Sequence, residues 1–136
     1  MITDKTALAV RLVDAWNSLD PERVVDLLTE EHVYEDVTFG AVTHGAAETR
    51  QFFQGAYTAF PDIHFTLSGV VVNSGCSAFE WTMTGTHKGD MPGLPATGKP
   101  FTIRGATVFG IAGDKICAVR DYWDLATLLR QVGLMA

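Results

Sequence analysis

The spacing of the apolar residues changes close to Pro61, and this change constrains the fold more than any other feature of the sequence. Before Pro61 the apolar residues recur every three or four positions, which is the period of a helix. After it they alternate with other residues, as Phe79, Trp81 and Met83 do, which is the period of a strand with one buried face. Helices followed by strands are typical of the α+β class, so we predict helices packed on one face of an antiparallel sheet.

Three helices are predicted before Pro61. Thr3 or Asp4 can cap the first helix and Asp20 the second, because a side-chain oxygen at that position accepts a bond from a free backbone N–H. The third helix runs over residues 45–60, and Pro61 ends it because the residue before a proline avoids the helical conformation. The buried stripe of the second helix is predicted to consist of Val24, Val25, Leu27 and Leu28.

Most of the remaining chain is predicted to form strands, over residues 32–39, 63–67, 79–83, 103–111 and 116–123. Glycine and proline cluster between residues 89 and 100, which predicts a long loop, and a final short helix over residues 125–132 ends at Gly133. No linker, repeat or low-complexity segment interrupts the chain, and its 136 residues suffice for one hydrophobic core. We therefore expect a single domain over residues 1–136.

The charge balance limits the partners. The 16 acidic residues outnumber the 10 basic ones, giving a net charge of −6, whereas binding to nucleic acid or anionic lipid needs clustered Lys and Arg. The apolar runs are too short to span a bilayer and the charged N-terminal region is unlike a signal peptide, so we expect a cytoplasmic protein. Cys76 and Cys117 are expected to be free, buried thiols. No metal-binding motif is present, so we expect neither a metal nor a cofactor.

Asp121 is the residue that most suggests chemistry. Strand alternation places it on one face of the last predicted strand with Cys117, Val119 and Trp123, in an otherwise apolar row. Burial there would raise the pKa of the carboxyl and make it a better base near neutral pH. The alternative is structural: Asp121 forms an ion pair with an arginine such as Arg120, Arg104 or Arg50.

Further candidates lie elsewhere in the chain. Tyr34 and Asp36 point the same way from an extended segment, which places a hydroxyl donor beside a carboxylate, unless this is an ordinary exposed strand. Trp16 and Trp123 either line a pocket or belong to the core. His87 borders the long loop and has either a catalytic or a structural role there.

Four segments in the second half of the chain resemble the SnoaL-like polyketide cyclases. They are Gly-Thr-His-Lys-Gly at 85–89, Gly-Leu-Pro-Ala-Thr-Gly-Lys at 93–99, Gly-Asp-Lys-Ile at 113–116 and Leu-Leu-Arg-Gln-Val-Gly at 128–133. Ala-Trp-Asn at 15–17 and Tyr-Glu-Asp at 34–36 are compatible with the same family. The resemblance covers essentially the whole chain.

This resemblance implies the nuclear transport factor 2-like fold, in which a curved, cone-shaped antiparallel sheet packs against three N-terminal helices as a cystatin-like α+β barrel with a pocket inside. It places the family's catalytic aspartate on Asp121, which acts as acid and base in a cofactor-free intramolecular aldol condensation. His87 matches a histidine of the family motif. Thr107 stands where the best-known cyclases have a second active-site histidine.

A second resemblance concerns the limonene epoxide hydrolases of the same superfold. Their closing-strand motif is similar to residues 120–124, and their Tyr-x-Asn pair is similar to residues 34–36, with Asp36 in place of Asn. Their Arg-x-Asp corresponds to Glu80 and Thr82, so that an acid role would fall to Glu80. The alternation leaves open whether Glu80 or Trp81 faces inward.

Three functions follow from these observations. The first is an acid/base enzyme on a small hydrophobic carbonyl compound, a cyclase or proton-transfer isomerase with Asp121 as base; the others are an epoxide hydrolase or dehydratase, and a non-catalytic ligand-binding domain. Asp121 and His87 are the expected catalytic residues. The expected substrate-binding residues are Trp16, Tyr34, Asp36, Phe53, Glu80, Thr107 and Trp123. Apolar residues on both sheet faces, together with the superfold, favour a homodimer.

Overall fold

The computed structural model describes residues 4–136, and its helical half follows the predicted order. Helix α1 (Lys5–Asn17) begins at Asp4, whose side chain accepts a hydrogen bond from the Ala7 N–H at 3.0 Å. The alternative cap, Thr3, lies outside the described residues. Helix α3 (Gly45–Ala59) ends directly before Phe60 and Pro61, as predicted.

Helix α2 (Pro21–Val25) is shorter than predicted. Asp20 caps it, with its side chain accepting from the Glu22 N–H at 3.0 Å, but Leu28 already begins strand β1 (Leu28–Asp36). The Leu27 carbonyl accepts a hydrogen bond from the Ile116 N–H at 2.9 Å, across the sheet. Pairing with a distant strand therefore decides the conformation at Leu27 and Leu28. The local spacing of apolar residues does not reveal that pairing.

The strands form one six-stranded sheet in the order β2-β1-β6-β5-β4-β3. The other strands are β2 (Ala41–His44), β3 (His64–Val71), β4 (Ser77–Thr86), β5 (Pro100–Ala112) and β6 (Lys115–Trp123). Most neighbours are antiparallel, as predicted, but β1 and β6 run parallel. Strand β2, which pairs with the end of β1, was not predicted.

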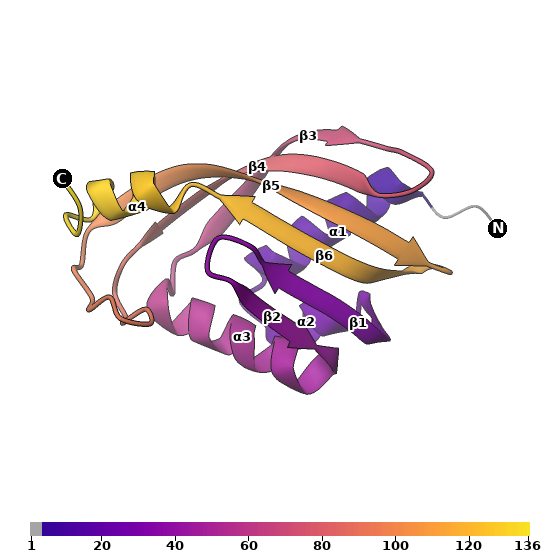
Figure 1. Cartoon of the computed structure of the whole chain (residues 1–136), viewed down its shortest axis with the longest axis horizontal. Coiled ribbons are helices and arrows are strands. Elements are labelled where there is room, and N and C mark those ends of the chain that lie inside the picture. The colour runs from indigo at the N-terminus through magenta and orange to yellow at the C-terminus, as the bar shows by residue number, and fades with distance from the viewer. Residues whose placement is uncertain (1–3) are drawn as a thin grey trace.

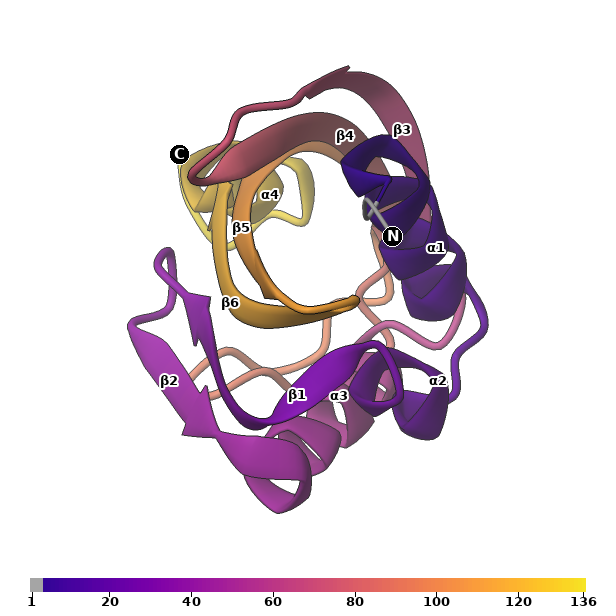
Figure 2. The same ribbon diagram turned by 90° about the vertical axis from the view of Figure 1, so that its right-hand side faces the viewer.

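The sheet is curved and the helices pack against it, as in the nuclear transport factor 2-like fold. Figure 2 shows β4, β5 and β6 bending around an interior that α1 flanks on its open side. Helix α1 contacts β3, while α3 contacts β1 and β2. Helix α4 (Leu125–Gln131) lies beyond the end of β6, at the opposite end of the molecule from the start of α1 (Figure 1).

The inward-facing row of the sheet explains where the candidate residues point. On β4, Trp81 is buried and Glu80 is exposed, so Trp81 faces inward. On β6, Val119 and Asp121 are buried as predicted. Further back on β6, Ile116 is buried instead of Cys117, because the pairing of β5 with β6 shifts between Gly110 and Ile111.

Both cysteines are free, as predicted, but neither is buried. Cys76 is exposed in the turn that joins β3 to β4, and Cys117 is half-buried beside the shift in β6. No helix within residues 4–136 is long and apolar enough to cross a membrane. The homodimer and the cytoplasmic location stay predictions.

The long loop after β4 is fastened to the end of α3. The backbone N–H groups of Lys88 and Gly89 both donate to the Ala59 carbonyl, at 3.1 and 3.0 Å. At Gly89 a Cβ atom would lie only 2.3 Å from the Thr58 carbonyl oxygen. The backbone of the loop therefore approaches α3 at a distance that only glycine allows.

We predict that Gly89→Ala lowers the free energy of unfolding by about 1–3 kcal/mol, because the loop must move away from α3 to make room for the methyl group. Urea denaturation measures the loss. Gly69→Ala in β3 is the matched control, because a Cβ there meets no atom within 4 Å. Equal stabilities of the two variants would contradict the close packing of the loop on α3.

Candidate active site

A cavity of about 810 Å³ lies between the helices and the inner face of the sheet. Asp121 lines it, together with Asp36 and with residues of the loop after β4, Asp90, Met91 and Pro92. Aromatic residues are the largest group on its wall: Trp16, Tyr34, Phe39, Phe52, Phe53, Tyr57, Phe60, Phe65, Trp81 and Trp123 line it. The cavity has the size and apolar character of a small-molecule site.

The Asp121 carboxylate receives one hydroxyl donor on each oxygen. The Tyr34 hydroxyl donates to Oδ2 at 2.8 Å, from the neighbouring strand β1. The Thr107 hydroxyl donates to Oδ1 at 2.7 Å, from the directly opposite position on β5. The indole N–H of Trp81 in turn donates to the Thr107 oxygen at 2.9 Å, which fixes the direction of the threonine hydroxyl.

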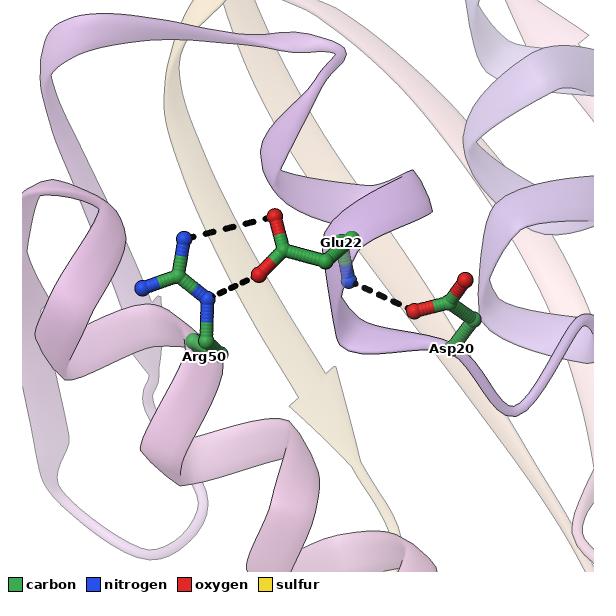
Figure 3. Close-up of polar contacts among 3 residues, drawn as sticks. All are labelled: Asp20, Glu22 and Arg50. Atoms are coloured by element: carbon green, nitrogen blue, oxygen red, sulfur yellow. Dashed lines mark hydrogen bonds and ion pairs between the residues drawn. The ribbon is translucent and has the colours of Figure 1, made fainter.

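Asp121 has no arginine partner among residues 4–136, contrary to the structural alternative. Figure 3 shows where Arg50 is instead: it pairs with Glu22 at the start of α2, on the outside of the molecule. The charge of Asp121 is therefore balanced by neutral hydroxyl donors alone, in a place from which water is largely excluded.

Burial raises the pKa of Asp121 from 3.8 to about 7. The hydrogen bonds from Thr107 and Tyr34 act in the opposite direction, because they stabilise the charged form, and the negative charge of Asp36 adds to the rise. The pKa of Tyr34 is raised well above 10, chiefly by burial and then by the charge of Asp121. Tyr34 therefore remains a protonated donor at neutral pH, while Asp121 exchanges its proton near pH 7.

Asp36 is the second buried carboxylate on the cavity wall. It pairs in register with Asp121, across the parallel β1–β6 ladder. Its oxygens accept from the Trp123 indole N–H at 3.0 and 3.1 Å and from the Phe39 backbone N–H at 2.9 Å. Burial raises the pKa of Asp36, and the hydrogen bonds from Phe39 and Trp123 oppose that rise.

Most of the predicted substrate-binding residues lie at the cavity. Trp16, Tyr34, Asp36, Phe53 and Trp123 line it, and Thr107 is fully buried directly behind Asp121. Trp16 approaches Tyr34, but its buried indole N–H makes no hydrogen bond of good geometry within residues 4–136.

Glu80 does not lie at the cavity, contrary to the prediction. Its side chain is on the outer face of the sheet, in a shallow surface depression with Arg104 and Tyr122. Since successive side chains of a strand point to opposite faces, the inward position of Trp81 forces Glu80 outward. An acid role for Glu80 in this cavity is therefore excluded by the geometry.

His87 also lies away from the cavity wall, contrary to the expected contact with substrate. It is fully buried at the base of the long loop, with its ring 5.9 Å from that of Phe60 and its Nδ1 3.3 Å from the Thr97 hydroxyl. Its backbone N–H donates to the Lys99 carbonyl at 2.9 Å, and its carbonyl accepts from the Gly98 N–H at 2.7 Å. These contacts make His87 an anchor of the loop.

Trp81 is a site residue that sequence reasoning missed, because its place in an alternating row indicates ordinary core. Its role depends on the contact with Thr107, which lies two positions beyond its strand partner Gly105. A Cβ at Gly105 would lie 2.5 Å from the Trp81 ring. A glycine in the interior of a predicted strand is the signal that could have indicated such a close approach.

No three His, Cys, Asp or Glu side chains within residues 4–136 are grouped closely enough to hold a metal ion. The buried polar groups at the site are the two carboxylates and their neutral donors. This arrangement can accept and return a proton within an apolar cavity.

Comparison with solved structures shows the same fold in several bacterial proteins. A protein of Pseudomonas putida assigned as a polyketide cyclase is 26% identical, with 96% of this chain and 98% of that chain covered and a TM-score of 0.81. IdmH of Streptomyces antibioticus, also assigned as a polyketide cyclase, is 24% identical over 94% of this chain and 97% of its own, with a TM-score of 0.79. AclR of Streptomyces galilaeus, assigned as a hydroxylase, is 21% identical over 96% and 85%, with a TM-score of 0.81.

No curated protein matches the sequence. The model of the SnoaL-like polyketide cyclase family matches residues 6–132. This range spans the helices and strands from α1 to α4, apart from the first residue of α1. The order of helices and strands and the presence of the cavity agree with this family match. The chain belongs to the SnoaL-like polyketide cyclase family.

Proposed function

We propose that this protein is a cofactor-free acid/base enzyme, a cyclase or proton-transfer isomerase of a small hydrophobic carbonyl compound, with Asp121 as its general base. One observation carries the proposal: the Asp121 carboxylate is buried on the wall of an apolar cavity, with hydroxyl donors and without a cationic partner among residues 4–136. A carboxylate without a counter-ion in such a place is a stronger base than one in water.

In the proposed reaction Asp121 takes a proton from the carbon next to a substrate carbonyl. The electron pair of the broken C–H bond forms an enolate, and the proton now resides on the Asp121 carboxyl. In a cyclase the enolate carbon attacks a second carbonyl of the same molecule, and the new alkoxide recovers the proton. In an isomerase Asp121 returns the proton to a different carbon. Neither course needs an external oxidant or reductant.

The donors on Asp121 have two roles in this reaction. They hold both carboxylate oxygens in place, so the base meets the substrate in a fixed orientation. A protonated Asp121 no longer requires a hydrogen-bond donor on each oxygen. The Tyr34 hydroxyl can then donate to the enolate oxygen instead. A base with a pKa near 7 combines a large ionised fraction with good proton affinity at neutral pH.

Hydrolysis or dehydration in the same cavity is the second candidate, and one observation favours it. An epoxide hydrolase needs a second carboxyl group beside the base, and Asp36 supplies one on the cavity wall. Asp121 and Tyr34 would then hold the attacking water. Parallel assays with a hydrophobic epoxide and with a diketone distinguish the two reactions.

We predict that Asp121→Asn lowers kcat/KM for cyclisation of a hydrophobic 1,5-diketone by about 10²- to 10⁴-fold, because the amide cannot take up the proton. Product formation followed by chromatography measures the loss. Glu80→Gln is the control: it removes one carboxylate from the outer face of the same sheet and retains activity. Full activity in Asp121→Asn, or an equal loss in both variants, would rule out Asp121 as the base.

The pH dependence of activity reports the protonation of Asp121. The active form is the carboxylate, so kcat/KM falls as the pH drops through about 7. Thr107→Val removes one donor to the charged form, so we expect the acidic limb to move to higher pH by about 1–2 units, the equivalent of one hydrogen bond to a charged group. A limb that stays in place would show that the Thr107 hydroxyl does not stabilise the carboxylate.

Asp121 also makes the stability of the fold depend on pH. The direction is opposite to that of a carboxylate in an ion pair. Its pKa is higher in the folded state than the 3.8 of the free side chain, so the folded protein binds more protons and loses stability as the pH rises from about 4 to 7. The ionised carboxylate costs up to about 4 kcal/mol above that range, at 1.36 kcal/mol per pKa unit. In urea denaturation, the free energy of unfolding of Asp121→Asn should therefore rise relative to that of the wild type between pH 5 and pH 8. A stability difference that is independent of pH would contradict the raised pKa.

A further inference from the structure

The cavity carries charge of one sign only. Asp36, Asp90 and Asp121 line it, whereas its lining within residues 4–136 includes no lysine, arginine or histidine. Ten aromatic side chains form most of the remaining wall. A carboxylate or phosphate on the ligand would meet negative charge in an apolar medium, where repulsion is strong. The cavity is therefore unsuited to anionic compounds.

Asp36 lies among aromatic rings at one part of this wall. The indole N–H of Trp123 contacts both of its oxygens, at 3.0 and 3.1 Å, and the backbone N–H of Phe39 contacts one at 2.9 Å. The rings of Phe39 and Trp123 pack edge to face against each other, with centroids 5.0 Å apart. All three residues line the cavity. The carboxylate is thus held in a fixed position beside two aromatic rings.

We propose that Asp36, Phe39 and Trp123 bind an ammonium group, so that the substrate of the proposed reaction is a hydrophobic carbonyl compound with a protonated or quaternary amine. This inference rests on the proposed function. A cation is attracted chiefly by the carboxylate, and aromatic ring faces along the cavity wall add to that attraction. An ammonium group also supplies the positive charge that the two carboxylates lack.

The position of the subsite limits the shape of the substrate. Asp36 and Asp121 are register partners on adjacent strands, whose backbones lie about 5 Å apart. An amine held at Asp36 therefore places carbon atoms only a few bonds away beside Asp121. The predicted substrate carries its amine close to the carbonyl group and its remaining apolar part along the aromatic wall. Asp36 binds, and Asp121 remains free to move the proton.

Three matched probes test the subsite without turnover. Benzyltrimethylammonium, its uncharged isostere neopentylbenzene and the anion phenylacetate are compared by their displacement of the neutral dye Nile red from the whole protein. We expect the cation to displace the dye at a concentration about tenfold lower than the isostere, through the combined attraction of the Asp36 carboxylate and the partly exposed aromatic rings. Phenylacetate should not displace it. Equal displacement by the cation and the isostere would overturn the proposal.

Two variants test whether the preference for the cation over the isostere comes from Asp36. Asp36→Asn should reduce the advantage of the cation over the isostere to about twofold or less, whereas Glu35→Gln, which removes the same charge from a residue off the cavity wall, should retain it. If Asp36→Asn does not fold, as judged by circular dichroism, Phe39→Leu removes one ring at an exposed position and should weaken the preference several-fold. An unchanged preference in the folded variant would show that the subsite lies elsewhere.

The ammonium subsite and the proposed function can fail independently of each other. A clear preference for the cation together with normal turnover by Asp121→Asn would retain the ammonium subsite and reject Asp121 as the base. Turnover of uncharged diketones that depends on Asp121, with no preference for the cation, would retain the proposed function and reject the subsite.

Discussion

The buried carboxylate of Asp121, which has no cation beside it in the described part of the chain, is the constraint on which the rest of the site depends. A charge in an apolar cavity loses its hydration, and two hydroxyl groups on neighbouring strands supply the only hydrogen bonds that replace it within the described chain. Those two bonds require β1 and β5 to flank β6 in the observed register. The sheet order and the chemistry of the site are therefore aspects of one arrangement.

The tryptophans of the inner wall connect the apolar and the polar parts of the site. Trp81 directs the Thr107 hydroxyl toward Asp121, and Trp123 holds the Asp36 carboxylate. Trp16 packs against Phe65, Phe79 and Trp81, with ring centroids 4.8, 5.7 and 6.0 Å away. Large rings thus fill the space around the cavity, and two of them also supply the N–H donors that order its polar groups.

The sequence was most informative where a residue's position follows from local periodicity. Alternation along β6 placed Asp121 inward, and the extended segment around Tyr34 and Asp36 turned both side chains to the same side. Alternation alone could not decide between Glu80 and Trp81, because it does not show which face of a sheet is covered by helices. Knowledge of the sheet's curvature was needed for that.

The sequence was least informative where contacts between distant segments decide the structure. The end of α2 at Val25 and the pairing of β2 with β1 depend on other strands, and no local signal contains them. The pairing shift that buries Ile116 instead of Cys117 is of the same kind. His87 matched a family motif, but a motif gives no direction to a side chain, and its ring anchors the loop.

The chemistry of the site depends above all on the protonation of Asp121, and its side-chain carboxyl can be followed directly by ¹³C NMR titration of the labelled protein. Asp121→Asn identifies the resonance by its disappearance. We predict that this carboxyl titrates at about pH 7, far above the 3.8 of a free aspartate. Titration near or below pH 4 would show a carboxylate stabilised in its charged form, and would contradict its role as the general base of the cavity.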